Sequence, residues 1–234
     1  MLQDLNKLFG KTIAAQDGHI GLLKDFLFDD KAWSIRYLVV DTGSWLKGRL
    51  VLLAPNSFGL LDHAAGILSV NLTKRAIEGS PSIDTHQPVS RQYEVDYYRY
   101  YGWPVYWNGG GMWGLAGYPM VEPTAKSEGD HELRFNRQGD SHLRSVRALV
   151  GYSMHAEDGP MGRLIGLEAD DRTWTIHNFL VDAGHWYSEK EIRVPTERIG
   201  SISYEESSVY VMLTKAEIKT TPLEGTAGVS DATR

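Results

Sequence analysis

The 234-residue chain contains no cysteine. Disulfide bonds, thiolate metal sites and cysteine nucleophiles are therefore excluded. The sequence also lacks any run of about 18 apolar residues, which is the length that a membrane-spanning helix requires. Its first ten residues do not have the basic and then apolar pattern of a secretory signal peptide. These absences predict a cytoplasmic protein without a membrane span.

The chain also has fewer basic than acidic residues. The chain has 24 lysines and arginines against 30 aspartates and glutamates, which gives a formal net charge of −6. A surface of this sign repels a phosphate backbone on average, which disfavours nucleic acid as a partner. Hydrophobic residues make up 42% of the chain and charged residues 23%, a globular balance, and the length suits two domains.

What the sequence does contain is an internal repeat. Residues 10–21 align with residues 151–162 at an offset of 141, and the match slips by one residue near Pro55 and Pro195 before it returns. An unusual offset kept over separated blocks predicts a duplicated domain. The repeated positions are Asp17, Gly18, Trp33, Asp41 and Trp45 in the first copy, and Asp158, Gly159, Trp174, Asp182 and Trp186 in the second.

Each copy has the pattern of short strands joined by tight turns. Asp17-Gly18 predicts a hairpin turn, and apolar residues alternate along 33–40. Thr73 is suited to cap a short helix that ends before Pro81. Many short strands and no long helix predict a mainly β fold of two small, closed or nearly closed barrels, each ending in a short helix. We expect domains at 1–84 and 142–222, an aromatic and glycine-rich connection at 85–141, and a disordered tail at 223–234.

Several motifs resemble a known family. They are Asp158-Gly-Pro-Met-Gly-Arg-Leu, Asp170-Asp-Arg-Thr-Trp-Thr-Ile, Leu180-Val-Asp-Ala-Gly-His-Trp and His142-Leu-Arg-Ser. Each copy resembles the PRC-barrel domain, a β-barrel named for the H subunit of the photosynthetic reaction centre and also found in the ribosome-maturation factor RimM. The connection is similar to that of bacterial proteins with two such domains. The resemblance implies a scaffold fold without a shared active site, so it does not by itself supply a function.

The connection is unusually aromatic for a linker. Tyrosine and tryptophan anchor interfaces at little cost in entropy, so this segment is expected to bind something. It either holds the two domains or two copies of the chain together, which we favour because exposed aromatic patches are rare, or it docks another protein. Stacking on single-stranded nucleic acid is a third hypothesis that lacks basic residues to support it. The residues are Tyr97, Tyr98, Tyr100, Tyr101, Trp103, Tyr106, Trp107 and Trp113.

The repeated aspartates and tryptophans are interpreted as structural. Each aspartate is closely followed by glycine, and aspartate at such a turn hydrogen-bonds its own backbone. The tryptophans are expected to pack in or beside each core. A metal site is a weaker hypothesis, with His155, Asp158, Asp182 and His185 as candidate ligands, because no tight metal-binding spacing is present. We expect no cofactor, and the sequence contains no nucleophile or nucleotide-binding motif that would predict an enzyme.

Three functional hypotheses follow. The first is a non-catalytic scaffold or adaptor that binds another macromolecule, with a protein as the expected partner. The second is a ribosome- or RNA-associated factor, by analogy with RimM, which would use Arg134, Arg137, Arg144 and Arg147. The third is a small-molecule or metal binder at a barrel mouth near His155, His185 and Trp186. Self-association into a homo-oligomer stays open.

Overall fold

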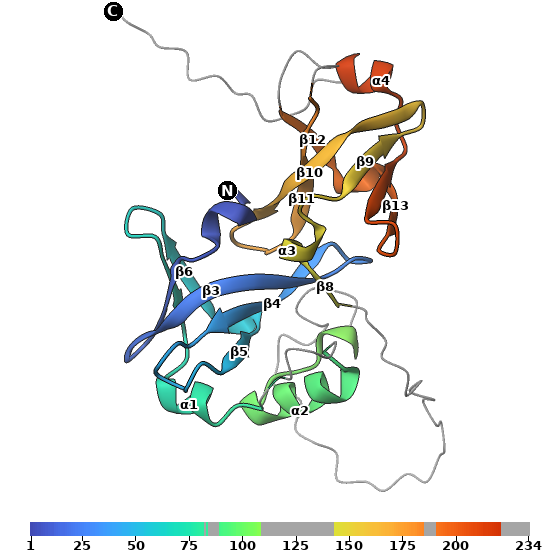
Figure 1. The fold of residues 1–234 in the computed structure, drawn as a ribbon. Coiled ribbons are helices and arrows are strands. Elements are labelled where there is room, and N and C mark those ends of the chain that lie inside the picture. The colour runs from blue at the N-terminus through green and yellow to red at the C-terminus, as the bar shows by residue number, and fades with distance from the viewer. Residues whose placement is uncertain (82, 84–88, 109–142, 185–190, 221–234) are drawn as a thin grey trace, which may run out of the picture. The chain divides into compact units, whose positions relative to one another are not determined.

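The computed structural model describes residues 1–81, 83, 89–108, 143–184 and 191–220. Strands predominate, and they form two seven-stranded sheets (Figure 1). The prediction of a mainly β fold is therefore confirmed. Most of the predicted connection, the predicted tail, Trp113, His185 and Trp186 lie outside the described residues. No helix among the described residues is long and apolar enough to cross a membrane.

The chain divides into two compact units. Unit 2 is continuous and comprises Gly10–Arg144, whereas unit 1 combines Met1–Phe9 with Ser145–Arg234. The units differ from the domains expected at 1–84 and 142–222, because the first nine residues group with the second half of the chain. The reason is a strand pairing: β1 (Leu2–Asp4) lies antiparallel to β10 (Gly159–Asp170).

Unit 2 contains the first sheet. Its strands follow the order β5-β4-β3-β2-β7-β6, and β8 (Leu143–Ser145) pairs with β3 outside this path. Along the path from β5 to β6, the β2–β7 pair is parallel and the other pairs are antiparallel. The elements are β2 (Thr12–Ala15), β3 (Gly18–Asp29), β4 (Ser34–Asp41), β5 (Leu50–Leu53), η2 (Pro55–Ser57), β6 (Phe58–Asp62), β7 (Ile67–Val70), α1 (Lys74–Glu78), α2 (Arg91–Tyr101) and η3 (Tyr106–Asn108).

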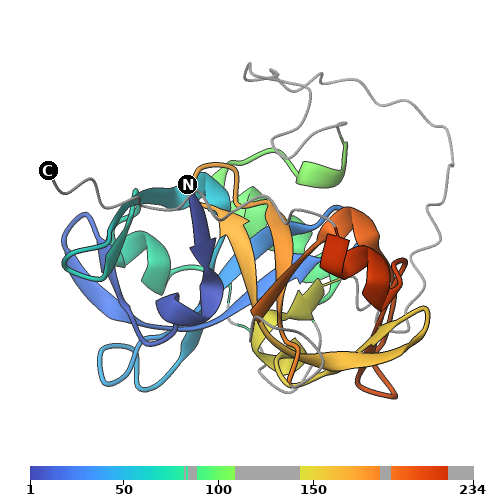
Figure 2. The ribbon, with the colours of Figure 1, turned by 90° about the horizontal axis from the view of Figure 1, so that it is seen from above.

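Unit 1 contains the second sheet, whose order β12-β11-β10-β9-β14-β13 repeats that of the first. Figure 2 gives a second view of these elements, coloured from blue to red along the chain. Beside β1, β10 and η1 (Leu5–Leu8), unit 1 contains α3 (Val146–Leu149), β9 (Ser153–Ala156), β11 (Ile176–Asp182), β12 (Glu191–Pro195), η4 (Thr196–Arg198), β13 (Ile199–Ser203), β14 (Ser208–Val211) and α4 (Lys215–Thr220).

The strand register is the same in both sheets at an offset of 141. Thr12 faces Leu22 and Ser153 faces Arg163 in the first pair of strands. After the prolines, Phe58 faces Val70 just as Ile199 faces Val211. The slip that the sequence suggests near Pro55 and Pro195 is therefore wrong. Pro195 takes the place of Ala54, and η2 and η4 begin at the same point of each unit.

Each sheet is an open path of paired strands. Within the described residues, no strand pairing joins β5 to β6 or β12 to β13, which end the two paths. The pairings therefore establish two sheets of one topology, which is less than the closed barrels that we expected. As predicted, a short helix follows the last strand of each copy in chain order, α1 after β7 and α4 after β14.

A close backbone approach explains one repeated glycine in each unit. Gly21 and Gly162 have φ values of +156° and +144°, which L side chains rarely adopt. A Cβ atom at either position would lie 2.0 Å from a carbonyl oxygen, that of Asp41 or of Asp182. Glycine is therefore required where β3 and β10 pass closest to the ends of β4 and β11.

Candidate functional site

The most aromatic segment of the chain forms α2, a helix with clear end signals. The Ser90 hydroxyl accepts a hydrogen bond from the Tyr93 N–H at 3.2 Å, which caps the first turn. Gly102 ends the helix in the left-handed conformation with φ +68°. The sequence analysis missed this helix, although Ser90 and Gly102 stand at the distance that a short helix needs.

The aromatic side chains of α2 and η3 cover the outer face of β4 and β5. Tyr97, Tyr98 and Tyr106 are buried there against Tyr37 and Leu52. We call this cluster the aromatic roof of unit 2. Its partly buried members are Tyr93, Tyr101, Trp103 and Trp107. The rings meet at stacked and edge-to-face angles, as in the Tyr101–Trp103 pair at 4.6 Å between centroids.

The Tyr97 hydroxyl of the roof is hydrogen-bonded twice within unit 2. The Tyr97 hydroxyl accepts from the Ala54 N–H and donates to the Leu52 carbonyl, both at 3.1 Å. This one hydroxyl therefore caps the backbone at the end of β5, the last strand of the path. Burial raises the pKa of Tyr97 well above its usual value, so the phenol stays neutral and able to donate.

A fully buried carboxylate lies at the centre of the roof. Glu94 Oε1 accepts hydrogen bonds from the hydroxyls of Tyr37 at 3.0 Å and Tyr106 at 2.8 Å. The Arg36 guanidinium lies 4.0 Å from the centroid of the Tyr106 ring. A buried charge needs such partners, because desolvation otherwise costs several kcal/mol. The roof is thus a structural assembly in which polar groups and rings are used internally.

Seven of the eight aromatic residues singled out in the sequence lie on α2 or in the segment after it. Tyr100 is the most exposed of them, at 45% of its surface, and its hydroxyl donates to the Ala76 carbonyl on α1 at 2.9 Å. Trp113 lies outside the described residues. These contacts place the described part of the aromatic segment within unit 2.

The corresponding face of unit 1 is polar. Glu168, Asn178 and Arg193 stand where unit 2 has Leu27, Tyr37 and Leu52. The Asn178 amide and the Arg193 Nε both donate to the Glu168 carboxylate at 3.1 Å. Pro195 replaces Ala54, so the N–H that Tyr97 caps in unit 2 does not exist in unit 1. The polar residues and the proline distinguish this face from the one that the aromatic roof covers in unit 2.

Unit 1 exposes apolar surface on a different face. Tyr210 and Met212, at β14 and just after it, are 41% and 50% exposed. The Tyr210 ring stacks on His155 of the neighbouring β9, with 5.3 Å between centroids. The Tyr210 hydroxyl donates to Glu206 Oε2 at 3.0 Å, and this bond raises the pKa of Tyr210. We call His155, Tyr210 and Met212 the β14 face.

Unit 2 lacks this surface. At the offset of 141, the counterparts of His155, Tyr210 and Met212 are Ala14, Ser69 and Asn71. Small and polar residues therefore occupy in unit 2 the positions where unit 1 presents an aromatic pair and a methionine. The sequence analysis did not single out Tyr210 or Met212, because their signal appears only when the two copies are compared position by position.

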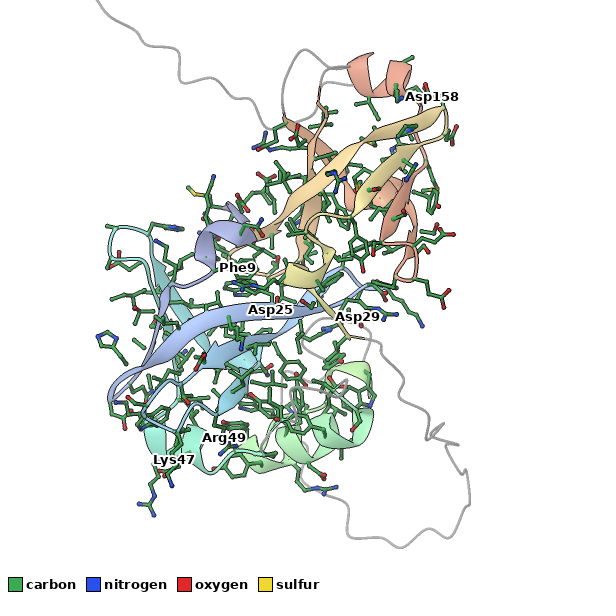
Figure 3. The ribbon with its side chains drawn as sticks, in the orientation of Figure 1. Phe9, Asp25, Asp29, Lys47, Arg49 and Asp158 are labelled. Atoms are coloured by element: carbon green, nitrogen blue, oxygen red, sulfur yellow. The ribbon has the colours of Figure 1, made fainter. Side chains whose placement is uncertain are left out.

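The repeated aspartates make two kinds of contact. Asp41 and Asp182 accept from the N–H of Gly43 and Gly184, at 2.9 and 3.0 Å, which is the turn contact that aspartate favours. Asp17 and Asp158 instead accept from the first backbone N–H groups of α1 and α4, at 2.8 and 3.0 Å. Figure 3 places Asp158 at the tip of the β9–β10 hairpin, near α4. These two aspartates therefore fasten a hairpin to a helix in each unit.

The repeated tryptophans stand at strained turns. Trp33 and Trp174 are left-handed, with φ values of 51° and 55°. Trp174 is buried, and the Trp33 ring stacks on Phe28 at 6.1 Å between centroids. The ring of half-buried Trp45 lies 5.5 Å from the Lys74 ammonium. These contacts are packing contacts inside each unit.

The weaker hypotheses gain no support from the residues that the structure describes. His155 stacks on Tyr210, and Asp158 and Asp182 accept backbone hydrogen bonds. In the described part of the chain, no three His, Asp or Glu residues are grouped to hold a metal ion; His185 lies outside it.

The arginines proposed for nucleic acid are engaged or lie outside the described residues. Arg144 Nε donates to Asp30 Oδ2 at 3.1 Å, and the Arg147 guanidinium lies 4.8 Å from the Phe9 ring centroid. Arg134 and Arg137 lie in the segment that the structure does not describe.

Comparison with known proteins supports the resemblance for part of the chain. No curated protein matches the sequence. The matched part runs from β1 to the end of α1, and it therefore includes Gly21, the Asp17 contact to α1 and both repeated tryptophans of the first copy. Residues 3–78 match the family model of the PRC-barrel domain.

Proposed function

We propose that this protein is a non-catalytic scaffold that binds another protein through the β14 face of unit 1. We also propose that the chain is a tandem of two PRC-type domains that arose by duplication, which the common register at an offset of 141 supports. The family match covers a domain type without a shared active site, so binding is the function that it favours.

The observation that carries the proposal is the exposed group of Tyr210, Met212 and His155. Tyrosine supplies a large rigid surface at little entropic cost, and methionine adapts to varied partners. The counterparts Ser69 and Asn71 give unit 2 no such surface. Because unit 2 forms the same sheet with alanine, serine and asparagine at these three positions, the fold itself does not require His155, Tyr210 and Met212 there, and binding is a reason for their presence.

The aromatic roof supports the choice of the β14 face, because the roof residues already make their contacts within unit 2. Its buried tyrosines are hydrogen-bonded to the Ala54 and Leu52 backbone and to Glu94. Removing them from these contacts to bind a partner would expose a core and break buried hydrogen bonds. A surface that is exposed already, such as Tyr210 and Met212, binds without that cost.

The test replaces the β14 face with its counterpart from unit 2. A Tyr210→Ser and Met212→Asn double variant keeps residues that the same fold accepts at the same positions. Leu60→Ser is the matched control, because Leu60 of unit 2 is 84% exposed. Proteins that wild type retains from native lysate would be identified, purified and titrated against all three chains by calorimetry.

We expect one partner to bind wild type and the Leu60→Ser control equally, and the double variant at least about tenfold more weakly. Circular dichroism must give the same spectrum and melting curve for the three chains. A partner that binds the double variant with unchanged affinity would refute the assignment of the β14 face. Absence of any specific partner for folded wild type would refute the scaffold proposal itself.

A Trp103→Ala and Trp107→Ala variant tests whether the partner binds the aromatic roof instead of the β14 face. Both tryptophans pack against the core of the roof, so we expect lower stability of unit 2. The affinity for the partner should be unchanged at temperatures where the variant is folded. Loss of affinity in a fully folded variant would move the docking surface to the roof.

A further inference from the structure

Two strand pairs in this protein are counterparts of each other but are crossed. At the offset of 141, β1 (Leu2–Asp4) corresponds to β8 (Leu143–Ser145), and β3 corresponds to β10. Each short strand would be expected to join the long strand of its own copy. Instead β1 pairs with β10, and β8 pairs with β3. Backbone hydrogen bonds do not distinguish the two arrangements, so side chains must select between them.

The pairing site on β10 is shaped around Asp4 and Asn6. Asp4 faces Glu168 in the ladder, and its carboxylate caps η1 by accepting from the Asn6 N–H at 2.9 Å. The Asn6 side-chain amide donates to the Ile165 carbonyl. Leu5, between them, is fully buried. The N-terminal segment therefore rests on β10 through both polar and apolar contacts.

A glycine on β10 makes room for these side chains. A Cβ atom at Gly166 would lie 3.1 Å from Asp4 Oδ1 and 3.3 Å from Asn6 Nδ2, closer than side chains comfortably approach. The backbone at Gly166 is not left-handed, so conformation does not demand glycine there. A side chain at position 166 would require Asp4 or Asn6 to shift by a few tenths of an ångström, so their fit against β10 favours glycine there.

The counterpart of Gly166 on β3 is Asp25, which changes both space and charge. Asp25 Oδ1 accepts from the Phe26 N–H at 2.7 Å. Paired with β3, the N-terminal segment would bring Asp4 and Asn6 against the Asp25 side chain, at the position where β10 has glycine. The other segment has Ser145 and Arg147 in place of Asp4 and Asn6.

We propose that Gly166 and Asp25 direct the crossed pairing: β10 accepts the N-terminal segment, residues 1–9, and β3 rejects it. The partner of the β10 site is thus a segment of this same chain, recognised by Asp4 and Asn6. A consequence is that the continuous unit 2 is inserted between two pieces of unit 1. Completing unit 1 requires both ends of the chain.

Disulfide trapping can report the pairing directly, because the chain has no cysteine of its own. Leu2 faces Asp170 in the crossed ladder, and the counterpart of Asp170 is Asp29. A Leu2→Cys and Asp170→Cys chain reports crossed pairing, and a Leu2→Cys and Asp29→Cys chain reports the uncrossed alternative. Neighbouring strands bring the Cα atoms of facing residues within disulfide range. Mild oxidation and peptide mapping measure the rate of each bond.

The test then exchanges the two acceptor residues. In the otherwise unchanged chain, we expect the bond from residue 2 to 170 and no bond to 29. With Gly166→Asp and Asp25→Gly together, the rate of the 2–170 bond should fall at least tenfold. Adding Asp4→Ser and Asn6→Arg should restore it, because the N-terminal segment then has the residues of the other one. Arg163→Asp, at an exposed position of β10 outside the ladder with β1, is the control and should leave the rate unchanged.

Each outcome decides the proposal. Loss of the 2–170 bond with recovery in the rescued chain supports selection by Gly166, and appearance of the 2–29 bond supports it further. An unchanged rate after the exchange overturns it. So does an equal loss in the Arg163→Asp control, or failure of the rescue in a chain that circular dichroism finds folded. A 2–170 bond between two chains, seen as a dimer without reductant, overturns the assignment to the same chain.

Discussion

Replacing Tyr97 with phenylalanine keeps the ring in the aromatic roof but removes the hydroxyl that caps β5. That hydroxyl makes two hydrogen bonds, to the Ala54 N–H and the Leu52 carbonyl, each 3.1 Å long. Ala54 and Leu52 are at most 1% exposed, so water does not replace the lost partner. A buried donor left unpaired costs about 1 to 3 kcal/mol. We expect Tyr97→Phe to lower the free energy of unfolding of unit 2 by about 2 kcal/mol.

A second substitution tests whether the unpaired N–H is the cause. Unit 1 has Pro195 where unit 2 has Ala54, and the Ala54 φ of −83° is close to the values that proline adopts. Ala54→Pro removes the N–H and places ring carbons toward the position of the missing hydroxyl. In the Tyr97→Phe background it should therefore cost less than in wild type.

The two substitutions form a double-mutant cycle, followed by urea unfolding with tryptophan fluorescence and by hydrogen exchange of the β5 amides. We expect a favourable coupling of about 1 kcal/mol or more between the two changes. A Tyr97→Phe chain within about 0.5 kcal/mol of wild type would refute the capping argument. Strict additivity would refute the assignment of the cost to the Ala54 N–H.

Further substitutions test other contacts of the same fold. Glu94→Ala should cost about 2 to 4 kcal/mol in urea unfolding because two buried phenols lose their acceptor, whereas Glu94→Gln should cost clearly less because an acceptor oxygen remains. Gly21→Ala should cost more than about 3 kcal/mol or prevent folding of unit 2, whereas Gly43→Ala, with open space around it, should cost about 1 kcal/mol of turn strain. Asp158→Ala should cost about 1 kcal/mol and raise hydrogen exchange in α4. Burial raises the pKa of roof tyrosines, that of Tyr101 to about 12. The neutral phenols therefore contribute their full stability below about pH 10, which is the pKa of tyrosine in the unfolded chain. The urea concentration at the midpoint of unfolding should fall as the pH rises from there toward 12.

The strands and turns could be predicted from the sequence because local signals fix them. Asp-Gly pairs mark the hairpins, alternation marks the strands, and Thr73 caps α1 through its hydroxyl and the Ala76 N–H. The repeat at an offset of 141 then carries the same prediction to the second half. Local chemistry does not reveal the long-range role of Asp17, whose carboxylate reaches the N-terminus of a helix 57 residues along the chain.

The helix α2 and the crossing of β1 and β8 could not be predicted so directly. In α2, tyrosines dominate the sequence, and their weak helix preference hides the end signals of Ser90 and Gly102. The three-residue strands β1 and β8 resemble each other, and either fits either partner by pattern alone. Which long strand each one joins depends on side chains brought together only in the folded chain.

The two copies share one fold, so any difference in their roles must come from the positions where their residues differ. Tyr97 and Ala54 of unit 2 form a capped edge, and Pro195 removes from unit 1 the N–H that such a cap would satisfy. Tyr210 and Met212 add to unit 1 an apolar surface that unit 2 replaces with small polar residues. Because both sheets keep one register throughout, none of these differences is needed to form a sheet. Unit 2 buries most of its aromatic cluster against its own sheet, whereas the exposed Tyr210 of unit 1 is the residue through which we propose that a partner binds.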